Sequence, residues 1–217
     1  NWAGTLGFFS QPHIYSKSLL QGGPRIFLSD QYGFWWAVNG DSRKKLFFTY
    51  NGWTKTGGTG SYYLLENAFG VTYQPIDRLK LSLQPKYTTI LDQNTLSLAS
   101  RADVVISPNI AIQYYGEPFI SSGTYDRFGY VDQPLEQVGN GQIHYFENER
   151  EEWSTWDIDD DQNGTVDYTI GNPDFSFAQF RSNLVFRWEY RPGSELFVVR
   201  AQGLTDTGLP SRRLLES

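Results

Sequence analysis

The clearest chemical pattern in the chain is the acidic segment DIDDDQNGTVD, which spans Asp157–Asp167. Oxygen-bearing side chains stand at alternate positions ahead of Gly164, and a glycine there permits the sharp turn with which a loop wraps a hard cation such as Ca²⁺. We therefore expect a calcium loop whose ligands are the side chains of Asp159, Asp161, Asn163 and Asp167 and the backbone carbonyl of Thr165.

The same segment is open to a second interpretation. Ile170 occupies the twelfth position, where an EF-hand needs a bidentate glutamate, so the pattern is closer to short calcium loops of extracellular β-proteins. Alternatively, Asn163-Gly164 is a turn in an acidic, solvated loop that holds no ion.

A second group of carboxylates precedes this segment, at Glu147, Glu149, Glu151 and Glu152. A glycosidase needs a pair of carboxylates, one of them with a raised pKa. The surrounding residues are polar and offer no apolar pocket, so a solvated loop is the better interpretation. A hydrolase remains an alternative, and it requires Glu149, Glu151 or Glu152 to lie about 5–10 Å from another carboxylate in a cleft.

Composition excludes several other classes of site. Cysteine is absent, so the chain has no disulfide, thiol nucleophile or zinc–thiolate centre, and His13 and His144 are the only histidines. A net charge of −6 argues against a nucleic-acid partner, because nucleic acids select basic surfaces. The sequence has no run of 18 apolar residues, so it does not predict a transmembrane helix. Gly57–Gly60 has no following lysine and is not a phosphate-binding loop.

The elements that must position these residues are strands. Between Arg181 and Gly203, large apolar residues alternate with polar ones on both sides of a tight turn at Arg191–Ser194. A period of two is typical of a strand with one apolar face. Such alternation predicts nine strands: Trp2–Phe9, Arg25–Val38, Lys45–Asn51, Ser61–Gln74, Arg78–Tyr87, Thr95–Ile106, Ile110–Phe119, Arg181–Tyr190 and Glu195–Gln202.

The connections between these strands differ in length. Short ones are expected at Gly40–Lys44, Pro75–Asp77, Ser107–Asn109 and Arg191–Ser194. Longer ones are expected at Gly52–Gly60, Thr88–Asn94 and, longest, Ile120–Phe180. Alternation of short and long connections in an antiparallel up-and-down meander is typical of outer-membrane barrels, which place short turns at the periplasmic end and long loops outside. The fold class that we predict is therefore all-β, one domain over residues 1–217, with a long external loop at about 120–180.

What covers the apolar faces decides between a membrane wall and a soluble sandwich. Several of the expected strands reach the roughly 9–11 residues that cross a bilayer at a tilt. Aromatic residues expected near strand ends suit the interfaces of a membrane, although they also suit an ordinary core: Trp35, Trp36, Trp53, Tyr62, Tyr63, Tyr114 and Tyr115.

Four blocks of the sequence resemble one bacterial family. They are Leu20–Pro24 with Asp41–Lys44, Tyr73–Pro75 with Leu79–Leu83, Tyr115–Gly123, and Gly171–Phe175 running into Phe180–Ser194. These blocks, in this order, are similar to a domain of unknown function that follows a family-nine-type carbohydrate-binding module in proteins of Bacteroidetes and some marine Proteobacteria.

The resemblance implies an outer-membrane β-barrel with the sugar-binding module upstream. It also implies that the segment from Asn1 to Ser217 lacks the first part of the barrel and its closing strand, and that the acidic loop before Gly171–Phe175 is a regular feature. The family supplies no catalytic residues. We therefore expect a non-catalytic, outer-membrane part of a surface glycan-handling protein, with membrane lipid as partner and glycan held by the upstream module. The alternatives are a soluble, calcium-dependent carbohydrate-binding β-sandwich and a carbohydrate hydrolase.

Overall fold

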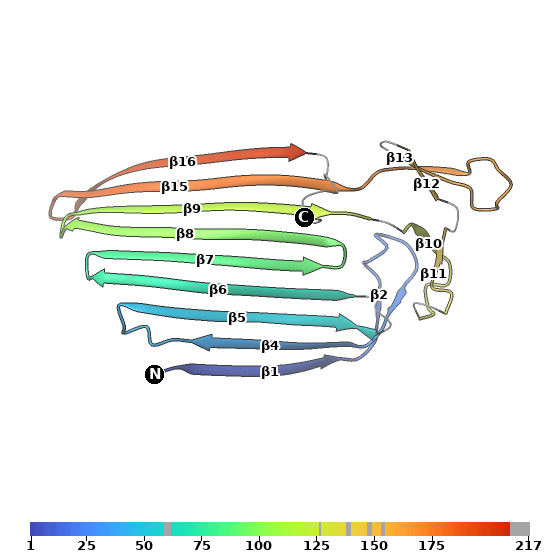
Figure 1. Cartoon of the computed structure of the whole chain (residues 1–217), viewed down its shortest axis with the longest axis horizontal. Helices are drawn as coiled ribbons and strands as arrows, with labels where there is room; N and C mark the ends of the chain where they lie inside the picture. The colour runs from blue at the N-terminus through green and yellow to red at the C-terminus, as the bar shows by residue number, and fades with distance from the viewer. Residues whose placement is uncertain (59–61, 126, 138–139, 147–148, 153–154, 209–217) are drawn as a thin grey trace, which may run out of the picture.

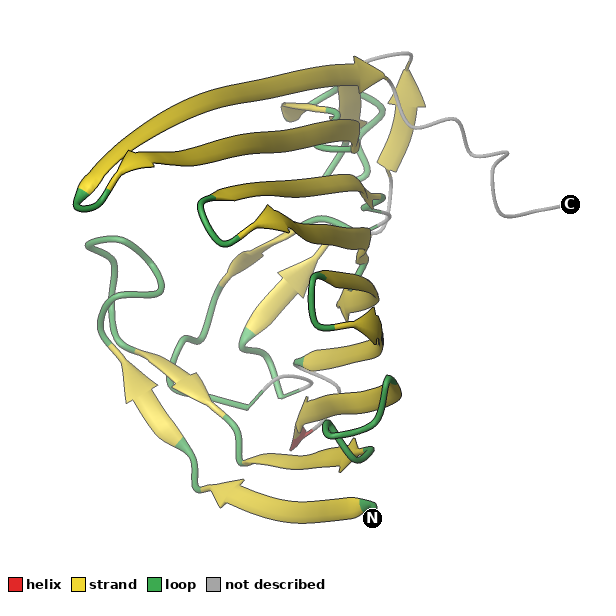
Figure 2. Ribbon diagram, turned by 90° about the vertical axis from the view of Figure 1, so that its left-hand side faces the viewer, coloured by secondary structure: helices red, strands yellow, loops and turns green. Residues whose placement is uncertain are grey.

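The chain forms one large antiparallel sheet and three small ones. The computed structural model describes residues 1–58, 62–125, 127–137, 140–146, 149–152 and 155–208. Nine strands follow one another in the large sheet in the order β1-β4-β5-β6-β7-β8-β9-β15-β16 (Figure 1). The sheet bends but does not close, so β1 and β16 form two separate edges (Figure 2). The prediction of an all-β, antiparallel up-and-down meander is confirmed. No helix in the described ranges is long and apolar enough to cross a membrane.

The nine strands are long. Their bounds are β1 Ala3–Gln11, β4 Gln31–Asn39, β5 Leu46–Gly57, β6 Tyr63–Ile76, β7 Leu79–Ile90, β8 Gln93–Ser107, β9 Ile110–Gly123, β15 Phe175–Arg191 and β16 Ser194–Gly208. Most exceed the five or six residues of an ordinary globular strand. Alternation of apolar and polar residues sets their register, because a slip by one residue would move every side chain to the other side of the sheet.

Two of the expected long connections are shorter in the structure. The residues from Thr88 to Ile90 continue β7, and only residues 91–92 separate it from β8, with Leu91 at φ 48°. β5 likewise continues through Gly57. The predictions of long connections at Thr88–Asn94 and Gly52–Gly60 were wrong because the polar threonines of both segments were interpreted as loop, although β-branched residues favour strands.

One expected strand is two. The segment Arg25–Val38 divides into β3, Ile26–Leu28, and β4, Gln31–Asn39. The break falls at Ser29-Asp30, where the Asp30 carboxylate accepts a hydrogen bond from the backbone N–H of His13 at 2.7 Å. Aspartate competes with strand pairing in this way through its own short side chain.

The two longest connections, β1–β4 and β9–β15, lie at one end of the sheet, and the two-residue turn between β7 and β8 lies at that end too (Figure 1). The short turns β4–β5, β6–β7, β8–β9 and β15–β16 lie at the opposite end (Figure 1). At the end with the longest connections lie seven short strands: β2 Ile14–Ser16, β3 Ile26–Leu28, β10 Gly129–Val131, β11 Ile143–Tyr145, β12 Glu149–Glu152, β13 Thr155–Ile158 and β14 Tyr168–Gly171. The segment expected as a long loop at 120–180 therefore starts after Gly123, ends before Phe175 and carries five of these short strands.

Hydrogen bonds tie two of these distant connections together. The Phe27 N–H donates to the Pro134 carbonyl at 2.7 Å, and the Gln142 side-chain amide donates to the Phe27 carbonyl at 2.7 Å. Gln142 is only 2% exposed, so its amide is satisfied inside the protein rather than by water. This link joins the segment between β1 and β4 to the segment between β9 and β15, which belong to opposite halves of the sheet.

Candidate functional site

One side of the large sheet carries large apolar residues on all nine strands, and the polar residues that share it include Asn67 on β6 and Arg200 on β16. Residues directly opposite each other in an antiparallel pair share a side, so the register assigns each residue to a side. For example, Tyr73, Leu81, Ala102 and Tyr114 follow one another across β6, β7, β8 and β9. We call this the apolar side, and one member from each strand is Leu6, Phe34, Tyr50, Phe69, Leu83, Leu96, Ile120, Leu184 and Val198.

These apolar side chains are exposed rather than buried. Leu6 is 76% exposed at one edge, Leu83 is 44% exposed in the middle and Val198 is 55% exposed at the other edge. The apolar residues that are buried among the described ranges are Ile26, Phe27, Leu64, Ala68 and Ile158, and none of them belongs to the apolar side. The apolar side therefore has no second protein layer over it in the described structure.

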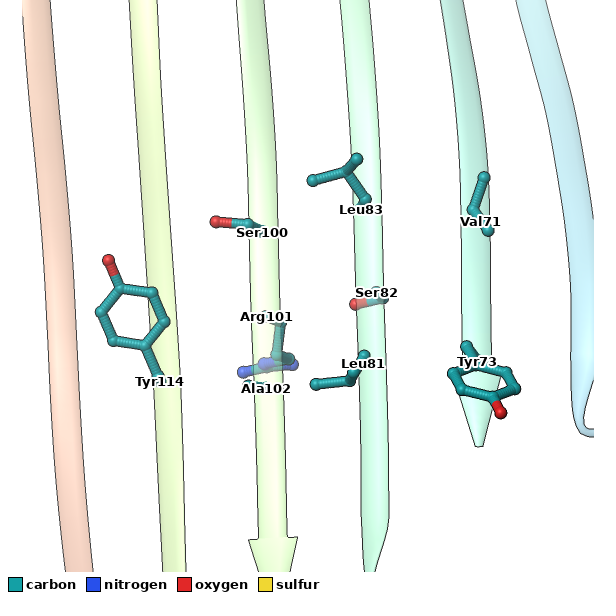
Figure 3. A pocket seen from close by; sticks show the side chains of 9 residues that line it. All are labelled: Val71, Tyr73, Leu81, Ser82, Leu83, Ser100, Arg101, Ala102 and Tyr114. Atoms are coloured by element: carbon teal, nitrogen blue, oxygen red, sulfur yellow. The ribbon is translucent and has the colours of Figure 1, made fainter. Parts of the chain in front are cut away.

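A shallow depression of about 330 Å³ marks the middle of the apolar side. Leu81, Leu83, Val71, Tyr73 and Tyr114 line it from β6, β7 and β9 (Figure 3). The depression is open and almost wholly apolar, with no convergent polar groups that would fix a small ligand. Its open shape and apolar lining make it an uneven part of the apolar side rather than an enclosed pocket.

The opposite side of the sheet is polar in its middle strands. On β7 this polar side carries Lys80, Ser82, Gln84 and Lys86. Two ion pairs lie on it: Lys86 Nζ is 2.9 Å from Glu66 Oε2, and Arg187 pairs with Glu195. Paired charges of both signs suit a wall that faces water.

Aromatic residues lie flat over glycines on both sides of the sheet. A Cβ on Gly52 would meet the Trp36 ring at 2.6 Å on the apolar side, and a Cβ on Gly7 would meet the Trp35 ring at 2.1 Å on the polar side. The adjacent tryptophans therefore face opposite ways. Sequence analysis grouped Trp35 and Trp53 with interfacial aromatics, but the register places both on the polar side, as it does Tyr115.

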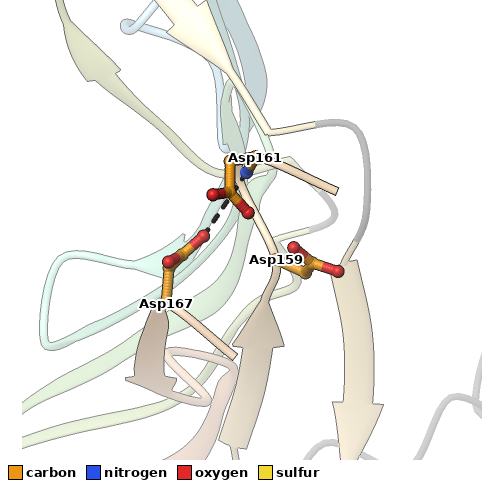
Figure 4. A group of neighbouring side chains, drawn as sticks. All are labelled: Asp159, Asp161 and Asp167. Atoms are coloured by element: carbon orange, nitrogen blue, oxygen red, sulfur yellow. Dashed lines mark hydrogen bonds between the residues drawn. The ribbon is translucent and has the colours of Figure 1, made fainter. Parts of the chain in front are cut away.

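The acidic loop lies at the far end from the short turns, between β13 and β14. One carboxylate oxygen each of Asp159, Asp161 and Asp167 lies within 4.8 Å of the other two (Figure 4). The backbone N–H of Gly164 donates to Asp159 Oδ2 at 2.8 Å, and Gly164 has φ +87°, which a residue with a Cβ rarely adopts. Asp167 Oδ2 accepts from the Asp160 N–H at 2.9 Å.

The structure brings together three of the five expected ligands. The Asn163 side-chain oxygen accepts hydrogen bonds from the Thr165 N–H, at 2.8 Å, and from the Thr165 hydroxyl. Asn163 and Thr165 thus contact each other in this arrangement. Three carboxylates at such a spacing are the kind of donor set that a hard cation such as Ca²⁺ prefers.

Aromatic residues surround the base of the acidic loop. His144 Nε2 lies 3.1 Å from Asp160 Oδ1, and its ring is 4.9 Å from that of Tyr130. Partial desolvation, followed by the carboxylates of Asp160 and Asp132, raises the pKa of Tyr130 above its ordinary value.

The carboxylates considered for hydrolysis do not form a described site. Glu147 lies outside the described residues, and so do the side chains of Glu149, Glu151 and Glu152, although the backbone of β12 pairs with β13. The described residues therefore do not test the hydrolase alternative, which stays a prediction from the sequence.

Sequence analysis missed one arrangement that the register creates. Phe9 on β1 lies opposite Gly33 on β4, and Trp35 on β4 lies opposite Gly7 on β1. Each strand therefore places an aromatic ring over a glycine of the other strand. The signal was present as Gly-Phe-Phe at Gly7–Phe9 and Gly-Phe-Trp at Gly33–Trp35. It could be recognised only with the pairing of the two strands.

Comparison of the chain with protein-family models, with curated proteins and with solved structures found no match. The interpretation of the site therefore rests on its own geometry.

Proposed function

We propose that the large sheet is part of the wall of an outer-membrane β-barrel, with its apolar side against lipid and its polar side toward an aqueous interior. In this proposal the chain is a non-catalytic part of a surface glycan-handling protein. The observation that carries the proposal is the apolar side itself, which continues over nine strands and is exposed on each.

The dimensions of the apolar side fit a bilayer. On β8 its apolar residues run from Leu96 to Ile106. At about 3.3 Å per residue this is roughly 33 Å along the strand, or about 25 Å across the membrane at a tilt of about 40°. Nine strands about 4.8 Å apart give a width of about 38 Å. The resulting area, on the order of 900 Å², exceeds the few hundred Å² of exposed apolar patch that soluble monomers tolerate.

The polar side and the bend of the sheet agree with this orientation. Glu66, Lys86, Arg187 and Glu195 form ion pairs on the side opposite to the apolar residues. A soluble β-sandwich would instead bring two apolar faces together in a closed core. The exposure of Leu83 and Leu184 in the middle of the sheet favours the wall over the sandwich.

The two edges of the sheet set a condition for this proposal. Backbone groups on the outer edges of β1 and β16 have no strand beside them among the described residues. In hydrocarbon every backbone N–H and C=O needs a partner, because water is absent. Further strands must therefore pair with both edges when the wall is in the membrane.

The short strands and the acidic loop lie together at the end opposite the short turns, which is the external end in this proposal. We place a calcium ion in the Asp159–Asp167 loop, where it would offset the repulsion of the three carboxylates. The glycan-handling role in this proposal is supported by the resemblance of the four sequence blocks alone.

Fractionation of a Gram-negative host that expresses the full-length protein tests this proposal. We expect the protein in the outer-membrane fraction, resistant to extraction with alkaline carbonate. Protease added to intact cells should cut within residues 155–174 and leave the nine strands intact. Recovery of folded protein in the soluble periplasmic fraction would contradict the proposal.

A further inference from the structure

Trp35 is an exposed aromatic residue of the polar side. It is a large apolar side chain, 44% exposed, on a side that presents charged and hydroxyl groups in its middle strands and also apolar residues on the outer strand β16, where Phe197 and Val199 are 54% and 61% exposed. Its ring lies flat against the sheet, because the ring atoms Cε2, Nε1 and Cζ2 lie 2.1–2.4 Å from the point where a Cβ of Gly7 would stand. One face of the indole therefore rests on the backbone of β1 and the other face is turned away from the sheet.

Neighbouring strands extend this flat surface. Phe9 lies in the same manner over Gly33, with its ring 2.2 Å from the position of a Cβ there. Trp53 on β5 is directly opposite Trp35, and Glu66 on β6 is directly opposite Trp53. Two strand spacings place Glu66 about 10 Å from Trp35 between backbone positions, which is close to the length of a disaccharide.

Hydrogen-bonding groups stand beside the aromatic surface. Glu66 Oε2 lies 2.9 Å from Lys86 Nζ and 3.5 Å from the Thr88 hydroxyl oxygen. The side chains of Glu66 and Lys86 keep 24% and 45% of their exposure, so both can still reach a ligand. Because the charges of Glu66 and Lys86 cancel, this pair does not select an ionic ligand over a neutral one.

We propose that Trp35, Trp53 and the Glu66–Lys86 pair form a binding site for a neutral oligosaccharide on the polar side of the sheet. The C–H groups on one face of a pyranose ring are weakly positive and pack on the negative face of an indole ring. Hydroxyl groups at the ring edge then exchange hydrogen bonds with a carboxylate and an ammonium group. A flat indole beside a paired Glu and Lys supplies both contacts. This inference rests on the proposed aqueous interior, within which it names a ligand class.

The adjacent tryptophans allow a test that separates this inference from the proposed function. The full-length protein, labelled with 5-fluorotryptophan and folded into lipid nanodiscs, should give separate ¹⁹F resonances, which Trp35→Phe and Trp36→Phe assign. The probes are maltohexaose, cellohexaose and mannohexaose, and a nitroxide on the lipid acyl chains.

We expect at least one of the three sugars to shift the Trp35 resonance saturably and to leave the Trp36 resonance unchanged. Gly7→Ala keeps Trp35 but displaces its ring, so it should weaken sugar binding about tenfold or more; Lys86→Met should weaken it several-fold. Gly70→Ala, which meets the flexible Thr49 hydroxyl rather than an aromatic ring, is the matched control and should leave binding unchanged.

The outcomes are distinct. If none of the three sugars shifts the Trp35 resonance, or if Gly7→Ala binds as well as the parent, the oligosaccharide site is wrong, whereas broadening of Trp36 by the lipid nitroxide would still support the wall. If Trp36 is not broadened by the nitroxide, the wall itself is wrong, whatever the sugars do.

Discussion

Both sides of the large sheet pack a tryptophan ring over a glycine, but the residues around the ring differ between the two sides. Trp36 lies flat over Gly52 on the apolar side, and Trp35 lies flat over Gly7 on the polar side. Around Trp36 the neighbouring strands β1 and β5 present Leu6, Phe8 and Tyr50, whereas on the side of Trp35 the strands β5, β6 and β7 present Trp53, Glu66 and Lys86. Packing of aromatic rings over glycines is thus common to both sides of the sheet, and the residues around those rings differ between the sides.

A charge placed on each side should break this comparison most strongly. Leu83→Arg puts a guanidinium in the middle of the apolar side, whereas Ser82→Arg puts it on the polar side of the same strand. We expect Leu83→Arg to lower the free energy of unfolding by about 2–4 kcal/mol, the cost of a cation near the bilayer midplane, and Ser82→Arg to change it little. Urea titration of the full-length protein in lipid vesicles measures both. Equal losses from the two variants would contradict the assignment of the sides.

Methyl groups on the two glycines should give the next largest difference. A Cβ at Gly52 would meet the Glu66 carbonyl oxygen at 2.5 Å as well as Trp36, so the backbone itself must shift. The three atoms nearest to a Cβ at Gly7 all belong to the side chain of Trp35, which can rotate toward water. We expect Gly52→Ala to cost about 1–3 kcal/mol and Gly7→Ala to cost less, as measured by the same titration. A larger loss for Gly7→Ala would show that the Trp35 ring has no room to move.

Calcium should act on the acidic loop and leave both sides of the sheet unchanged. At a free concentration about ten times its Kd, the ion should stabilise the loop by about 1.4 kcal/mol and slow protease cleavage within residues 155–174. Asp159→Asn should abolish this protection, whereas Asp132→Asn, outside the group of three carboxylates, should retain it. Cleavage at the same rate with calcium and with a chelator would remove the calcium proposal.

The Glu66–Lys86 pair should have the smallest effect on stability. Its charges are partly exposed, at 24% and 45% of their side-chain surface, so water screens most of their attraction. Lys86→Met should therefore change the free energy of unfolding by less than about 1 kcal/mol. A loss of several kcal/mol would mean that the polar side is buried rather than wet.

The sequence predicted the strands wherever apolar and polar residues alternate without interruption. Leu79, Leu81 and Leu83 against Lys80 and Ser82 defined β7 and its two sides directly. The predicted strand ends were wrong where polar, β-branched residues continue a strand, as at Thr88–Ile90. They were also wrong at Asp30, which divides the strand predicted at Arg25–Val38. Where a strand ends depends on its pairing with a neighbouring strand, and a single sequence does not show that pairing.

The candidate sites were predictable to different degrees. The grouping of Asp159, Asp161 and Asp167 follows from local spacing, and the structure brings their oxygens together. The surface formed by Trp35, Trp53 and Glu66 comes from three strands, so it required the register of β4, β5 and β6. The buried link between Gln142 and Phe27 joins residues 115 positions apart and has no local signal.

The most direct test of the membrane wall is tryptophan fluorescence of the full-length protein in bilayers whose acyl chains carry bromine. Bromine quenches only indoles that touch lipid, and Trp36 and Trp188 both lie on the apolar side. We predict strong quenching that falls with Trp36→Phe and Trp188→Phe and is unaffected by Trp35→Phe. A protein with a native β spectrum and no quenching would place the apolar side against protein and contradict the account.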